Sequence, residues 1–259
     1  MEKKKGISGS TLKMIAIVTM LIDHIGAAVL ARLLMVNGLG ELDQTNTDAI
    51  MQWLSANGAL YGTYTAMRMI GRVAFPIFCF LLVEGFLHTH DVKKYAMRLG
   101  LFALLSEIPF DLAFSSKILE FNYQNVFFTL FIGLLTMIAY RAVEEKEEWN
   151  QALKVILYIL IVAAGMALAY FLKTDYAEKG VFCIMVLYIF RKKKMWQIIA
   201  GCASFIWETP ALFGFIPIAF YNGTRGWKMK YFFYIFYPAH LLILYLLCYF
   251  MGISGYSAV

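Results

Sequence analysis

Charged side chains are scarce in this sequence of 259 residues. Only 15% of the residues are Asp, Glu, Lys or Arg, whereas 61% are hydrophobic. Typical soluble domains carry about 25% charged and about 45–50% apolar residues. The composition therefore excludes an ordinary soluble domain and predicts an integral membrane protein that crosses the bilayer several times. No polar linker divides the chain, so we expect one domain over residues 1–259.

Cysteine is also rare. The four cysteines lie in apolar segments and none belongs to a Cys-x-x-Cys pair, so we expect neither a disulfide framework nor a metal site. His88-Thr89-His90 has too few ligands for a metal, because no cysteine or carboxylate cluster accompanies it. The net charge of +6 does not predict nucleic-acid binding, since the basic residues fall in short loops between apolar runs.

Long apolar runs dominate the rest of the sequence. Backbone groups cannot stay unpaired in lipid, so each run should form a helix. We expect an all-α transmembrane bundle of about nine segments, two of them short or re-entrant. The runs cover residues 12–36, 64–88, 95–114, 124–141, 152–172, 177–190, 195–207, 210–221 and 231–251.

Basic residues concentrate in alternate loops. Nine crossings from a cytoplasmic N-terminus leave only Lys117, Lys173 and Lys179 in the outer loops. This asymmetry follows the positive-inside rule and predicts a cytoplasmic N-terminus. The inner groups are Lys3 to Lys5, Lys93 and Lys94, Arg141 and Lys146, Arg191 to Lys194, and Arg225, Lys228 and Lys230.

Two segments are less regular. Runs 195–207 and 210–221 are short for full spans, and Glu208-Thr209-Pro210 should interrupt a helix between them. A pair of short helices and a re-entrant hairpin are both compatible with the pattern, because both keep the flanking basic loops on one side. Residues 37–60 contain no Lys or Arg, and we expect them to form a long outer loop.

Asp23 and His24 lie in the middle of the first apolar run. A charged group at this depth costs roughly 2.5–3.5 kcal/mol on insertion scales, and such groups usually face a cavity or a partner. Adjacent helical residues point about 100° apart, so each side chain could have its own partner on another helix. The pair is either a polar packing contact or a catalytic site, in which the His24 imidazole would suit general-base chemistry.

The second run places ionisable residues near both of its ends. Arg68 and Arg72 are four residues apart and share one helix face. Two guanidinium groups there would bind an anion, or they would pair with carboxylates such as Asp23 and Glu84. Glu84 could also bind a ligand, although polar residues at helix ends are often interfacial. Pro76 should kink this helix and open a cavity.

Later helices carry further polar residues. Asn125 and Thr129 share one face of their helix, which fits either a packing seam or a substrate groove. Asp175 precedes a predicted helix and could be its N-cap. His240 lies within the last apolar run, where a neighbouring carbonyl could satisfy it.

Short blocks around these residues extend over nearly the whole chain. They are Leu12-Lys13, Asp23 to Gly26, Arg68 to Pro76, Glu84 to Phe86, Tyr95 with Arg98-Leu99, Ser106 to Phe110, Asn125 to Thr129, Asp175-Tyr176 and Phe236 to Leu241. Together they resemble the TraX family of polytopic membrane proteins, whose namesake is linked to N-acetylation of conjugative pilin. The resemblance implies a membrane-embedded acyltransferase in a bacterial cytoplasmic membrane, distantly similar to enzymes that use cytosolic acetyl-CoA.

The resemblance also implies roles for individual residues. It nominates His24 as general base, oriented or charge-balanced by Asp23, and acetyl-CoA as the acyl donor. The residues it offers for the donor phosphates are Arg98, Arg68, Arg72, Arg191 and Lys192. Those it offers for substrate binding are Glu84, Asn125, Thr129, Asp175, Tyr237 and His240.

The acceptor stays open between an amine, such as a peptide N-terminus, and a hydroxyl. Two other classes of function are compatible with the sequence. A proton-coupled transporter or flippase would use the same membrane carboxylates and histidines, although no inverted repeat is evident. A non-catalytic partner of a pilus or secretion system would tolerate substitution of each polar residue.

Overall fold

The computed structural model describes residues 5–43, 45–227 and 230–257, and within these ranges the chain is helical with no named strand. Lys3, Lys4 and Lys228 of the predicted inner groups lie outside the described residues. The α-helices are α1 (Gly9–Ile25), α2 (Ala31–Val36), α3 (Thr47–Gly71), α4 (Ala74–His88), α5 (Val92–Ser115), α6 (Val126–Glu144), α7 (Gln151–Phe171), α8 (Ala177–Ile189), α9 (Lys194–Ser204), α10 (Phe215–Ala219) and α11 (Lys230–Phe250). A π-helix η1 (Gly26–Leu30) joins α1 to α2, and η2 (Leu39–Glu41) and η3 (Thr209–Gly214) are 3-10 helices.

The all-α prediction is confirmed, and five helical stretches among the described residues are long and apolar enough to cross a membrane. They are Gly9–Val36, Thr47–His88, Val126–Glu144, Gln151–Phe171 and Phe232–Phe250. The chain therefore has the long apolar helices of a multi-pass membrane protein. Most apolar runs match a helix within a few residues, because both the run and the helix end where polar loop residues begin.

The prediction of a long loop over residues 37–60 is wrong for its second half. Helix α3 begins at Thr47, where the Asn46 side chain caps it by accepting a hydrogen bond from the backbone N–H of Ala49 at 3.1 Å. The first half of α3 is too polar to register as an apolar run. Capping and a favourable acidic residue, Asp48, start this helix instead.

The helix is interrupted between α3 and α4, at Arg72 and Val73. Pro76 is the third residue of α4 and has no N–H, so the carbonyl of Arg72 cannot receive its usual helical hydrogen bond. The interruption that Pro76 predicted is therefore present, one turn before the proline.

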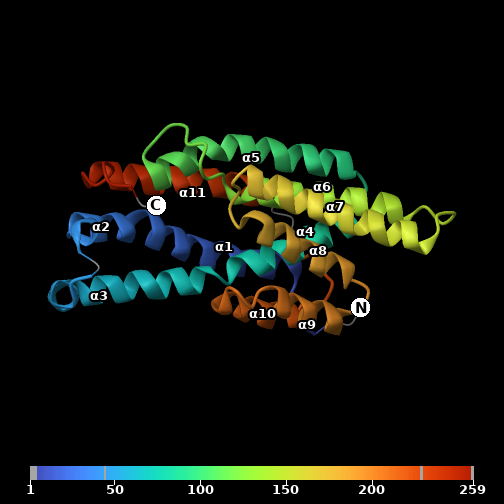
Figure 1. Ribbon diagram of the computed structural model, residues 1–259, viewed down its shortest axis with the longest axis horizontal. Coiled ribbons are helices and arrows are strands. Elements are labelled where there is room, and N and C mark those ends of the chain that lie inside the picture. The colour runs from blue at the N-terminus through green and yellow to red at the C-terminus, as the bar shows by residue number, and fades with distance from the viewer. Residues whose placement is uncertain (1–4, 44, 228–229, 258–259) are drawn as a thin grey trace.

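The basic loops share one end of the bundle, which Figure 1 shows together with the N-terminus. The backbone N–H of Ile7 donates to the carbonyl of Phe220 at 2.9 Å, and Arg191 pairs with Glu144 at 2.7 Å. We refer to this end as the basic end. At the other end lie α2, η2 and the start of α3 (Figure 1).

Residues 194–221 form a hairpin of short helices. Helix α9 leads away from the basic end, and η3 and α10 return to it (Figure 1). The Lys194 ammonium donates to the carbonyls of Ala219 and Tyr221, at 2.7 Å each, so the hairpin begins and ends at the same place. The two basic loops that flank the hairpin therefore lie at the same end of the bundle.

Candidate functional site

A cavity of about 110 Å³ lies where α1, the α3–α4 junction and α5 meet the loops before α6 and α8. Five of the residues selected from the sequence line it, although they come from distant parts of the chain. They are Asp23, His24, Arg68, Arg72 and Asp175. The fold thus gathers Asp23 and His24 of the first apolar run and Arg68 and Arg72 of the second around one space.

Asp23 and His24 have separate partners, as their different directions on α1 predicted. The Arg68 guanidinium donates to Asp23 Oδ2 at 2.8 Å. The His24 Nδ1 atom lies 2.6 Å from His240 Nε2 on α11. His24 is therefore oriented by a second imidazole rather than by the neighbouring Asp23.

The two imidazoles form a short chain that ends on the backbone of α11. The His240 Nδ1 atom lies 2.7 Å from the carbonyl oxygen of Phe236, so the carbonyl expected for this histidine is present. The two imidazole planes are parallel to within 3°. Phe114 and Tyr237 present their rings edge-on to His24, with centroids 5.5 and 6.0 Å away. Aromatic packing therefore holds His24 in one orientation.

The Asp23 carboxylate lies where two helices approach very closely. Any Cβ added at Gly71 of α3 would collide with the Asp23 side chain, so glycine is needed at this crossing. Among the described residues, Asp23 Oδ1 is buried without a hydrogen-bond partner. A buried polar atom of this kind at a cavity wall is available to a ligand or a water molecule.

Arg72 pairs with a residue that the sequence did not suggest. Its Nε atom lies 3.0 Å from Glu208 Oε1 at the turn between α9 and η3, and its Nη1 lies 3.5 Å from the Tyr176 hydroxyl. Glu84 is instead near His88, with 3.9 Å between its Oε2 and the His88 Nδ1. Glu84 does not line the cavity.

The loop before α8 forms another wall. The Tyr123 hydroxyl donates to Asp175 Oδ1 at 2.6 Å, and Thr129 donates to the Asp175 carbonyl. Burial raises the pKa of the Asp175 carboxyl, and the hydrogen bond from Tyr123 partly offsets this rise. The suggestion that Asp175 is the N-cap of α8 is wrong, since Tyr176 occupies that position.

Tyr176 adopts a backbone conformation that is uncommon for a bulky residue. Its φ is +63°, in the left-handed region, which costs about 1–3 kcal/mol in a non-glycine residue. In return its ring stacks on Phe75 at 3.7 Å between centroids, and both rings line the cavity. Strain of this kind often accompanies a functional site.

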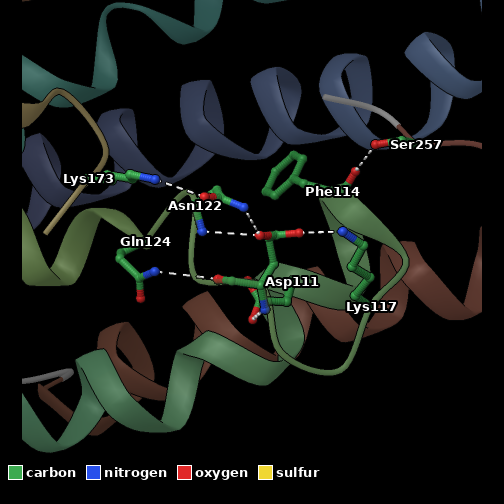
Figure 2. A network of polar contacts seen from close by, with 8 residues as sticks. Asp111, Phe114, Lys117, Asn122, Gln124, Lys173 and Ser257 are labelled. Atoms are coloured by element: carbon green, nitrogen blue, oxygen red, sulfur yellow. Dashed lines mark hydrogen bonds and ion pairs between the residues drawn. The ribbon is translucent and has the colours of Figure 1, made fainter.

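The loop between α5 and α6 is fixed to the same wall by a polar network, which Figure 2 shows from close by. The Glu120 side chain accepts from Lys117 at 2.5 Å, and its backbone N–H donates to Asp111 Oδ2 at 2.8 Å. Asn122 bonds to Glu120 and accepts from Lys173 at 2.8 Å. The network holds this loop, which carries Tyr123, against the loop that carries Asp175.

The other candidates lie outside the cavity. Asn125 caps α6 by accepting from the Phe127 N–H at 3.0 Å, and it also donates to the Glu107 carboxylate, which makes it a buried packing residue. Arg191 pairs with Glu144 at the basic end, and Lys192 Nζ lies 4.0 Å from the same carboxylate. Arg98 does not line the cavity either. The residues proposed for donor phosphates therefore form no single cluster.

Several wall residues were missed by the sequence reasoning. They include Tyr64, Tyr123 and Tyr176, and Glu208 behind Arg72. Tyr176 adjoins Asp175 in one of the sequence blocks, which could have identified it. Tyr123 and Glu208 carry no such signal, because loop residues reach the cavity only through the tertiary fold. Among the described residues, no group of three or more His, Cys, Asp or Glu could hold a metal ion.

The site therefore combines an imidazole, two guanidinium groups, carboxylates and tyrosine hydroxyls around a small space between helices. Such a set can bind a polar ligand, remove a proton from it and stabilise a developing negative charge.

The sequence of the chain is similar to those of known proteins. The chain is 26% identical, over 94% of its length and 97% of the relative's, to a protein of Dichelobacter nodosus named as probable fimbrial assembly protein FimC, serogroup H1. No solved structure matches it. The family described as TraX protein matches residues 8–248, so the resemblance inferred from the sequence blocks is confirmed and the chain belongs to the TraX family.

Proposed function

We propose that this chain is a membrane-embedded acyltransferase that serves the assembly of a surface fibre. The name of the Dichelobacter relative, a probable fimbrial assembly protein, supports the biological setting. One observation carries the chemistry: His24 lines a cavity between helices while its Nδ1 lies 2.6 Å from His240 Nε2. An imidazole fixed through one nitrogen presents the other nitrogen to a substrate, as general-base catalysis requires.

The proposed reaction transfers an acetyl group from acetyl-CoA, a substrate, to an amine or hydroxyl acceptor. His24 removes the acceptor proton as the acceptor's lone pair attacks the thioester carbonyl. The carbon–sulfur bond then breaks, and the departing thiolate takes up one proton, so the imidazole returns to its starting state. Arg68 and Arg72 line the same cavity and supply positive charge for the intermediate oxyanion.

Calorimetry on purified protein tests whether a donor site exists. We expect saturable acetyl-CoA binding by wild type, retained by His24→Ala and weakened by Arg98→Ala. Lys146→Ala is the matched control, because it removes a positive charge from the exposed loop after α6. Absence of binding to a folded, monodisperse wild-type sample would contradict the proposed donor.

The relative's name also favours a second candidate, a non-catalytic membrane partner in fibre assembly. In that case the polar residues would serve only to pack the helices. The two functions separate in cells that carry the His24→Ala protein: an assembly partner would still support fibre formation at normal protein level, whereas the acyltransferase would lose its product.

A further inference from the structure

We infer that His240 is a positioning residue that fixes the tautomer of His24, so that the lone pair of His24 lies on Nε2. This inference rests on the proposed function for its catalytic consequence. The tautomer itself is a property of the folded chain and is measurable without any substrate.

The direction of the first hydrogen bond is fixed by chemistry. The His240 Nδ1 atom lies 2.7 Å from the carbonyl oxygen of Phe236. A carbonyl oxygen can only accept, so His240 must carry its proton on Nδ1. A neutral His240 therefore has its lone pair on Nε2.

The second hydrogen bond follows from the first. The His24 Nδ1 atom lies 2.6 Å from His240 Nε2, a distance that requires one proton between the two nitrogens. Because the neutral His240 has none on Nε2, His24 must donate from Nδ1. The remaining nitrogen of His24, Nε2, then holds a lone pair, and it belongs to a ring that lines the cavity.

The same contacts can accommodate the proton that catalysis would deliver. When His24 Nε2 takes the acceptor proton, the proton on its Nδ1 can move to His240 Nε2 along the existing hydrogen bond. His24 is then neutral again, with its proton on Nε2, and His240 carries the positive charge while its Nδ1 still donates to Phe236. Returning the proton to the thiolate reverses these movements.

The chain's small number of histidines makes the tautomer measurable. It has four, and His88 and His90 lie near the basic end, away from the pair. In a His88→Gln, His90→Gln protein labelled with ¹⁵N-histidine, we expect both remaining rings to be protonated on Nδ1 and unprotonated on Nε2 at neutral pH. A neutral His24 ring protonated on Nε2 would overturn the inference.

Two substitutions at position 240 test the positioning role. His240→Gln keeps an acceptor for His24 Nδ1 and should retain the tautomer, whereas His240→Leu removes the acceptor and should release it. In acyl transfer we expect kcat to fall by up to about 10⁴-fold in His240→Leu, the loss seen when a catalytic histidine loses the partner that fixes its tautomer, with KM nearly unchanged and partial rescue in His240→Gln.

The outcomes separate the two proposals. If wild type shows the expected tautomer but no acyl transfer, the proposed function fails and the hydrogen-bond assignment stands. If wild type transfers acetyl groups and folded His240→Leu keeps both the tautomer and kcat, the positioning role fails. If His240→Leu does not fold, His240→Gln decides the question. A kcat at or moderately below that of wild type, with the His24 Nδ1 proton retained, supports the role. Loss of that proton with unchanged kcat overturns it.

Discussion

Two buried polar clusters lie on the same helical run, Gly9–Val36, and they differ in how fully their hydrogen bonds are satisfied. The Arg32 side chain is fully buried and donates to groups from three segments of the chain. Its acceptors are the carbonyl oxygens of Ala28, Leu112, Ala113 and Tyr256, the hydroxyl of Ser116 and the sulfur of Cys248. Asp23 and His24, by contrast, border a cavity, and Asp23 Oδ1 has no partner among the described residues.

Under the proposed function, the difference separates a structural cluster from a functional one. Arg32 binds carbonyls in the last turn of α5, where a positive charge is favourable, and it ties the segment around Tyr256 to the bundle. All its interactions are used within the protein. In the Asp23–His24 cluster, the buried Asp23 Oδ1 atom has no hydrogen-bond partner among the described residues and lies beside a cavity. An unpaired buried acceptor lowers the stability of the fold, but it is available to bind a ligand. Stability and activity should therefore respond to different substitutions.

Removing the His24 imidazole should have the largest effect. We expect His24→Ala to lower turnover by roughly 10²–10⁴-fold, because a general base contributes about that much, while thermal unfolding stays cooperative. Turnover in detergent-solubilised protein checks this, with His88→Ala as control, since the His88 side chain is 71% exposed. Full turnover by a folded His24→Ala protein would show that the Asp23–His24 cluster, like the Arg32 cluster, has only a structural role.

The Arg32 cluster should show the opposite response. Arg32→Met should lower the free energy of unfolding by about 3–5 kcal/mol, because several buried carbonyls would lose their donors together. Chemical unfolding in mixed micelles measures this change. The protein that still folds should keep acetyl-CoA binding. A stability equal to wild type would show that the Arg32 hydrogen bonds contribute little.

A smaller effect is expected at the crossing of α1 and α3. Gly71→Ala should destabilise the protein by about 1–3 kcal/mol, the usual cost of overpacking, and should disturb the Asp23–Arg68 ion pair. Gly62→Ala is the matched control on the same helix, where an added Cβ meets nothing within 4 Å. Equal unfolding free energies for the two variants would contradict the close approach.

The smallest effect should come from an ion pair that belongs to neither cluster. Arg141 and Glu145 are 3.6 Å apart, and the Glu145 side chain is 69% exposed. Glu145→Gln should change the free energy of unfolding by less than about 0.5 kcal/mol. A loss above 1 kcal/mol in the same unfolding assay would mean that surface charge matters more here than solvent screening allows.

The sequence predicts where most helices lie, because lipid requires an apolar run for each spanning helix. Of the nine predicted segments, however, the described residues give five stretches long and apolar enough to cross a membrane. The sequence also misses the first half of α3, whose polar residues form no such run. Of the site, Asp23, His24, Arg68 and Arg72 stand out because charge is costly in an apolar run. Their partners do not: the His24–His240 pair joins residues 216 positions apart, and the Arg72–Glu208 pair depends on the α9–α10 hairpin.

The most direct test follows acetyl transfer from radiolabelled acetyl-CoA in membranes that contain wild type, His24→Ala or His88→Ala at matched levels. The account predicts labelled product with wild type and His88→Ala and at most about one hundredth of that rate with His24→Ala. Equal labelling by all three proteins would contradict a catalytic role for His24, and absence of labelling by wild type would contradict the acyltransferase itself.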